Sequence, residues 1–388
     1  MIVRDAVNFE SGAIGVAPGI MHGAERHDPA EPSAAYRSGG FGAGGANLDP
    51  ILVFGAPRSG TTWLGKIFDS HPDVLYRHEP DLVQSDDGLP WVCPQPISAE
   101  LRGMAADYLD RLIRTGTLKT SAIRPSFPKN YRGPLRGAAR NGLVQAIRGL
   151  LALRVAPRRM DRFPIPDLVN KRPGKPWVVV KSVSAHGRAQ AFALAAPQAR
   201  VVVILRDPWG YVSSVMRGTA QGKFVSDAVL DWIPGSETGR RYGLTLAELT
   251  EMPVVERLAW NWAAMNEAFL DAFGDRPNAR MIRYDLLCER PAPLAREIFD
   301  FVGLPWHRQT EAFIAQSTTF RGAERYYGVF RDASQAPHRW RHEMPLGDQR
   351  RVDAILQRTR LARYCPDLGS DVTQCPVSEN SCMSGTGQ

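Results

Sequence analysis

Four short runs of apolar, mostly β-branched residues constrain the fold of this chain more than any other feature. They lie at residues 51–54, 177–180, 201–205 and 280–283. Apolar runs without polar alternation are typical of strands buried on both faces, as in a parallel sheet covered by helices. Helical periodicity follows at residues 61–70, 210–217, 254–273 and 291–302. The pattern predicts an α/β fold, a three-layer sandwich with a central parallel sheet of about five strands flanked by helices.

The composition indicates how the rest of the chain is organised around this sheet. The 388 residues are 44% hydrophobic and 23% charged, which is typical of a globular protein. Residues 1–48 and 365–388 are rich in small and polar residues, so we expect a flexible leader, one domain at 49–364 and a flexible tail. The first residues lack the uninterrupted apolar core of a secretory signal, and the five cysteines never take a CxxC spacing. We therefore expect a cytoplasmic location.

Positive charge is concentrated between two predicted strands. Residues 98–175 contain 17 Lys and Arg against five acidic residues, a net +12, whereas the whole chain carries +8. In residues 135–155, arginines alternate with apolar residues near one helical face. The apolar residues are Leu135, Leu143, Ile147, Leu150 and Leu151, and the arginines are Arg136, Arg140 and Arg148. We expect this helical basic insertion, at about 84–175, to be either a solvated helix or a docking surface for an anionic acceptor or for anionic lipid headgroups.

The strongest local motif is Gly55-Ala-Pro-Arg-Ser-Gly-Thr-Thr-Trp-Leu64, directly after the first apolar run. A Gly/Ser/Thr turn that leads into a helix points backbone N–H groups at one place, where the helix dipole also favours an anion. The spacing of Gly55 and Gly60 matches the start of a Walker A loop, but Thr61-Thr62 stands where Lys-Ser/Thr is required. The positive charge comes earlier, at Arg58. The motif therefore predicts a phosphate loop that differs from an ATP loop.

This loop resembles the 5′-phosphosulfate loop of sulfotransferases, a P-loop-like family that uses 3′-phosphoadenosine 5′-phosphosulfate (PAPS) as sulfuryl donor. The resemblance implies that the 5′-phosphate is held by Ser59, Gly60, Thr61 and Thr62. It also implies that Arg58 reaches the bridging oxygen and the sulfuryl group, and that Trp63 stacks on the adenine. The alternative for Trp63 is a helix residue packed in the core.

Two further segments extend the resemblance to residues 52–342. Residues 201–214 resemble the family's 3′-phosphate segment, with Arg206 at a strand end and Ser214 eight residues later in a helix. A guanidinium and a hydroxyl can share one phosphate, although Arg206 could instead pair with Asp207. Residues 338–342 resemble the closing segment of bacterial members, which implies a place for Arg339 at the 3′-phosphate.

Three residues are expected at the reacting atoms. The resemblance implies that Lys181, at a strand end, and Arg58 meet the charge on the leaving oxygen. As general base we favour Glu79, which we expect at the end of a second strand, beside the carboxyl end of the first. Glycan sulfotransferases carry a glutamate at a comparable distance past the loop. The alternative for Glu79 is a salt bridge to Arg58 or Arg77, and the reserve bases are His78 and His186.

These motifs predict a PAPS-dependent O-sulfotransferase that acts on a carbohydrate, a glycolipid or a small molecule. The basic insertion favours an anionic acceptor and would allow peripheral membrane contact; we expect no nucleic acid partner. Because Lys and Arg meet the charge on the sulfuryl group and no acidic ligands cluster in the sequence, we expect no metal. The alternatives are sulfation of a phenolic metabolite or protein tyrosine, an ATP-dependent kinase with a degenerate loop, and a non-catalytic glycan- or lipid-binding protein.

Overall fold

The computed structural model describes residues 50–84, 88–155, 157–170, 175–222, 230–319 and 336–365. The expected leader and all but the first residue of the expected tail lie outside these residues. Five strands form one sheet: β1 (Ile51–Phe54), β2 (Val74–His78), β3 (Trp177–Ser182), β4 (Arg200–Leu205) and β5 (Ala279–Arg283). Every pairing is parallel and the strand order is β2-β3-β1-β4-β5. The predicted parallel sheet of about five strands is confirmed.

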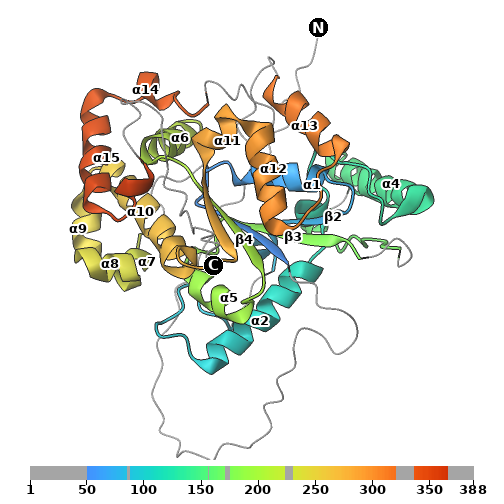
Figure 1. Ribbon diagram of the computed structural model, residues 1–388, viewed down its shortest axis with the longest axis horizontal. Helices are drawn as coiled ribbons and strands as arrows, with labels where there is room; N and C mark the ends of the chain where they lie inside the picture. Colours follow the sequence, from blue (N-terminus) through green and yellow to red (C-terminus); the bar gives the residue numbers. More distant parts are fainter. Residues whose placement is uncertain are drawn as a thin grey trace, which may run out of the picture.

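Helices cover both faces of this sheet, which gives the three predicted layers (Figure 1). One face is covered by α1 (Thr61–Ser70), α11 (Tyr284–Glu289), α12 (Pro291–Val302) and α13 (Arg308–Thr318). The other face is covered by α2 (Ala99–Arg114), α5 (Ala189–Ala195) and α10 (Val254–Phe273). Each layer has its own apolar cluster, because the strands present buried side chains to both sides.

A third apolar cluster packs six further helices around α10. These helices are α6 (Pro208–Ala220), α7 (Trp232–Gly235), α8 (Glu237–Tyr242), α9 (Leu246–Glu251), α14 (Trp340–Glu343) and α15 (Leu346–Arg358). Short 3-10 turns lie at Pro80–Leu82, Arg158–Arg162, His186–Arg188 and Ala362–Tyr364.

The expectation that every predicted strand is buried on both faces is wrong for β5. This strand lies at the edge of the sheet, and its side chains are mostly half-buried or exposed. Its Arg280 places its guanidinium 4.9 Å from the centre of the Phe301 ring instead of entering the core. An edge strand can carry such residues because only one side of it pairs with another strand.

The basic insertion leaves the sheet after β2 and returns to it at β3, and it contains α2, α3 (Leu118–Ser121) and α4 (Gly133–Ala152). On α4, only Ile147 of the predicted apolar face is buried, together with Val144. Leu135 is 85% exposed, whereas Arg140 is 4% exposed. The helix meets the rest of the domain along one narrow side, so the sequence pattern did not decide which residues are covered. Within the described residues, no helix is long and apolar enough to cross a membrane.

Candidate active site

The loop between β1 and α1 has the backbone geometry of an anion cradle. Gly60 takes a positive φ of 91°, and a side chain there would come within 2.4 Å of the Tyr284 ring, so only glycine fits. The buried Ser59 hydroxyl donates to the Ala56 carbonyl oxygen at 2.5 Å, which fixes the turn. Gly60 stands at the N-cap without a side chain that could cap α1. The N–H groups of the first turn of α1 are therefore left to meet a ligand.

The two predicted phosphate segments meet at Arg58. Its Nε donates to the Ser214 hydroxyl at 3.1 Å, and Arg206 Nη1 donates to the Arg58 carbonyl oxygen at 2.9 Å. This contact is possible because β1 and β4 are neighbours in a parallel sheet, so that the segments following them lie at the same edge. The two segments thus form one cationic cluster.

Arg206 is held in place by contacts other than an ion pair. Its guanidinium lies 5.1 Å from the centre of the Tyr284 ring, and its Nε is buried without a hydrogen-bond partner among the described residues. Asp207 instead caps α6, since its Oδ1 accepts from the Gly210 N–H at 2.6 Å. Among the described side chains, Arg206 therefore forms no ion pair with Asp207.

Glu79 and Lys181 form an ion pair at the carboxyl ends of β2 and β3. The Glu79 N–H also donates to the Lys181 carbonyl oxygen at 2.7 Å. The expectation that Glu79 lies beside the first strand is wrong, because β3 stands between β2 and β1. Its partner is Lys181 rather than either of the two predicted arginines, and Arg77 bonds to Asp167 through both Nη atoms.

The ion pair decides the protonation of Glu79. Burial raises the pKa of this carboxyl, but the Lys181 ammonium outweighs burial and holds the pKa at about 2. A carboxylate with so low a pKa is ionised at neutral pH, and it is a weak base as long as the ion pair persists.

The two reserve histidines are uncharged at neutral pH. Burial lowers the pKa of His78 to about 3 and that of His186 to about 4. His78 Nδ1 lies 3.0 Å from the Tyr76 hydroxyl, and its Nε2 lies 3.8 Å from Glu79 Oε1. His186 lies in a different environment, because its ring packs against Trp91 and Trp232.

Sequence reasoning missed Asp81, which lies two residues after Glu79. The Ser182 hydroxyl donates to its Oδ2, while its Oδ1 is buried without a partner among the described residues. Burial raises the pKa of Asp81 to about 6, in the range suited to proton transfer at neutral pH. The available signal was a second carboxylate directly after a predicted strand end.

The remaining two predicted residues, Trp63 and Arg339, lie in different segments of the fold. The half-buried Trp63 donates its indole N–H to the Ser317 hydroxyl at 3.0 Å, which fixes the ring against α13. Arg339 precedes α14, where Trp340 stacks on Trp209 of α6 at 5.2 Å. The carbonyl oxygen of Ala336, three residues before Arg339, accepts from Arg206 Nη2 at 3.4 Å. The C-terminal segment therefore contacts the cluster at Ala336, and the role of Arg339 stays a prediction.

Residues 50–308 match the sulfotransferase family. The chain belongs to the sulfotransferase family. The matched residues include every strand, the whole β1–α1 loop, Lys181, Arg206 and Ser214. This sulfotransferase is therefore an enzyme of the predicted class, and the kinase and non-catalytic alternatives fall away.

Relatives of this sulfotransferase include two human proteins. Carbohydrate sulfotransferase 1 is 22% identical over 373 residues, which cover 87% of this chain and 82% of the relative. Carbohydrate sulfotransferase 6 is 24% identical over 356 residues, which cover 85% and 84%. Among solved structures, the sulfotransferase domain from the curacin biosynthetic pathway covers 81% of this chain and 98% of its own, at 14% identity and a TM-score of 0.40.

Proposed function

We propose that this sulfotransferase transfers the sulfuryl group of PAPS to a hydroxyl of a carbohydrate or glycolipid, with Glu79 as general base. The observation that carries the proposal is the meeting of two phosphate segments at Arg58, through Ser214 on one side and Arg206 on the other. Two anion sites joined in this way suit a donor that carries one phosphate at the 3′ position and one at the 5′ position of the same adenosine.

The residues of the cluster fit such a donor. The uncapped first turn of α1 and the tight approach at Gly60 suit the 5′-phosphate. The Arg206 Nε, which is buried without a partner among the described residues, suits a 3′-phosphate oxygen, and the Ser214 hydroxyl, which accepts from Arg58, is the second group assigned to that phosphate. Trp63 and Arg339 are assigned to the adenine and the 3′-phosphate on the resemblance alone.

The chain's own residues then have distinct tasks. PAPS supplies a sulfuryl group on a phosphate leaving group. Arg58 and Lys181 stabilise the negative charge that grows on the leaving oxygen as its bond to sulfur breaks. Glu79 takes the proton of the acceptor hydroxyl as the acceptor oxygen bonds to sulfur. An anion that draws Lys181 away would weaken the ion pair and raise the basicity of Glu79, which couples donor binding to base activation.

The acceptor class rests on two supports. The relatives named above are carbohydrate sulfotransferases. The second support is the position of Glu79 in the sequence, because glycan sulfotransferases carry a glutamate at a comparable distance past the loop.

The donor assignment is tested by calorimetry with adenosine 3′,5′-bisphosphate and with Mg-ATP, followed by transfer from ³⁵S-labelled PAPS to chitotetraose and to 4-nitrophenol. We expect the bisphosphate to bind, ATP to bind at least about a hundredfold more weakly, and chitotetraose to be labelled. Tight ATP binding without bisphosphate binding would overturn the donor. Labelling of 4-nitrophenol alone would overturn the acceptor class in favour of phenols.

A further inference from the structure

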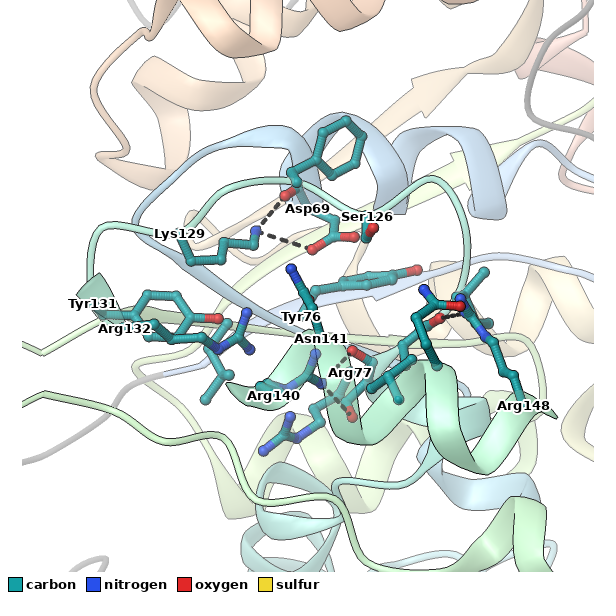
Figure 2. Close-up of a pocket in the computed structure, with 17 residues that line it drawn as sticks. Asp69, Tyr76, Arg77, Ser126, Lys129, Tyr131, Arg132, Arg140, Asn141 and Arg148 are labelled. Carbon is teal, nitrogen blue, oxygen red and sulfur yellow. Dashed lines mark hydrogen bonds and ion pairs between the residues drawn. The ribbon is translucent and has the colours of Figure 1, made fainter. Parts of the chain in front are cut away.

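A pocket that the proposed chemistry does not use lies at the free edge of β2, between this strand, α3 and α4 (Figure 2). Its cavity volume is about 40 Å³, which is room for a small group. Five cationic side chains and a single carboxylate, that of Asp69, line it. The cations are Arg77, Lys129, Arg132, Arg140 and Arg148.

The carboxylates near the pocket are already engaged. Asp69 accepts from Lys66 at 2.7 Å and lies 3.0 Å from Lys129 Nζ. The other nearby carboxylate, Asp167, is held by both Nη atoms of Arg77. None of the ion pairs among the described residues includes Arg132, Arg140 or Arg148. These three arginines therefore contribute positive charge without a paired carboxylate among the described residues, and Asp167 acts on Arg140 only from beyond ion-pair distance.

Arg140 is the clearest sign of a ligand site. It is 4% exposed, yet its only described partners are the Ser121 carbonyl oxygen at 2.8 Å and hydroxyl at 3.0 Å, both bonded to Nη2. Its Nε is buried with no partner among the described residues. A guanidinium presents donors in a fixed planar fork that matches an oxyanion, and an unsatisfied buried donor is costly.

The surroundings also disfavour the charged forms of these cations. Burial lowers the pKa of Arg140 to about 10, and it lowers the pKa of Lys129 to about 8 despite the nearby Asp69. Burial and the charge of Arg124 lower the pKa of Arg148. An anion in the pocket would offset each of these effects.

The pocket is connected to the proposed active site by β2. Tyr76 lines the pocket, and its hydroxyl bonds to His78, whose other ring nitrogen faces Glu79. Arg77 also lines the pocket and stands two residues before Glu79, a separation of about 7 Å along a strand. A short oligosaccharide with its hydroxyl at Glu79 could therefore reach the pocket with a neighbouring sugar.

We propose that this pocket binds a sulfate ester or carboxylate group of an acidic acceptor glycan, at a subsite separate from the donor site. Arg140 and Arg148 hold the oxyanion from α4, whereas the Lys129 ammonium, which also lines the pocket, is bonded to Asp69 (Figure 2) and to the His71 carbonyl oxygen. The inference rests on the proposed function, because it names the class of acceptor that this sulfotransferase takes.

The test uses the full chain saturated with adenosine 3′,5′-bisphosphate. Because the donor site is then filled, binding of a further anion measures the affinity of the pocket. Calorimetry measures binding of a chondroitin 4-sulfate tetrasaccharide, of chitotetraose and of inorganic sulfate. We expect the sulfated tetrasaccharide to bind at least about tenfold more tightly than neutral chitotetraose.

The key variant is Gln145→Glu, which places a carboxylate among the pocket residues at an exposed position and removes no contact of Arg140. Ala139→Glu is the matched control, since it adds the same charge to an exposed position of α4 outside the pocket. We expect the Kd for the sulfated tetrasaccharide to rise about tenfold in Gln145→Glu and less than about twofold in Ala139→Glu. In steady-state assays, KM for the same acceptor should rise in Gln145→Glu while kcat and the donor KM stay unchanged.

Three results would overturn the inference. One is equal binding of the tetrasaccharide by the wild type and Gln145→Glu; another is a loss of equal size in both variants. The third is binding of inorganic sulfate but not of the tetrasaccharide, which would mean a site for a free anion. Failure to bind the bisphosphate would instead refute the proposed donor, so the two proposals fail separately.

Discussion

Two clusters of cations lie on this molecule, one at the carboxyl ends of the central strands and one at the free edge of β2. In the first, Arg58 and Arg206 follow β1 and β4, and Lys181 lies near the end of β3. They are bonded to Ser214, to backbone and to Glu79. In the second, Arg140 and Arg148 come from an inserted helix and bond to carbonyl oxygens of Ser121 and Ala122. The first cluster is built by the sheet, whereas the second is added beside it.

This difference separates residues that the sheet topology brings together from residues that an inserted helix brings together. Loops after parallel strands converge on one edge whatever their detailed sequence, so a donor site there follows from topology. The inserted helix has no such constraint, and its arginines lie where the packing of α4 puts them. We therefore expect damage to the first cluster to abolish transfer, and damage to the second to change acceptor use or stability.

The largest expected effect is that of Arg58→Ala in the first cluster. Removing one fixed donor to a developing charge typically lowers turnover about a hundredfold to a thousandfold, and Arg58 also positions Ser214. The backbone carbonyl that holds Arg206 remains in the variant, so thermal unfolding should be nearly unchanged. Rates of ³⁵S transfer and unfolding curves measure both. Transfer at the wild-type rate would contradict the role of Arg58.

A smaller effect is expected for Glu79→Gln, which removes the carboxylate that pairs with Lys181 in the first cluster and leaves the second cluster unchanged. We expect kcat to fall about a hundredfold, because a positioned base contributes about that much, while the affinity for adenosine 3′,5′-bisphosphate stays within about threefold. Asp81→Asn is the matched comparison, since Asp81 lies two residues away with a pKa of about 6. A larger loss of kcat in Asp81→Asn would move the base to Asp81.

The smallest expected effect concerns stability in the second cluster. Arg77 is 1% exposed and its charge is met by Asp167, so Asp167→Asn leaves a buried guanidinium without its carboxylate. Because Asp167 is partly exposed, we expect a loss of about 2 kcal/mol in the free energy of unfolding, below the cost of breaking a fully buried pair. Urea unfolding at pH 7 measures it. Asp110→Asn, which breaks an exposed pair with Arg114, should cost less than about 0.5 kcal/mol. Equal losses in the two variants would contradict the prediction.

Much of the fold could be predicted because its signals are local. The helices α1, α10 and α12 begin and end at the predicted residues, and β1 does so too. Local patterns of this kind hold when strand and helix are both buried, since burial then enforces the periodicity. At β5 the strand was predicted, but its expected burial was wrong, because an edge position relaxes that requirement.

The candidate site was only partly predictable for the same reason. Glycine at position 60 and the arginines after two strands can be recognised from the sequence, because a tight turn and a strand end require particular residue types locally. The pairing of Glu79 with Lys181 joins residues 102 positions apart, and no sequence spacing encodes it. It depends on the strand order, which places β3 between β2 and β1.

The sequence by itself determined the parallel sheet, the phosphate loop and the excess of positive charge between β2 and β3. Only the tertiary structure decided which of those charges are buried, and it buried Arg140 while leaving Leu135 exposed. Burial is a property of what packs against a residue rather than of the residue itself. A helix that carries both arginine and leucine therefore has more than one possible inner face, and the packing of α4 against Ala122 and Ile165 selects between them.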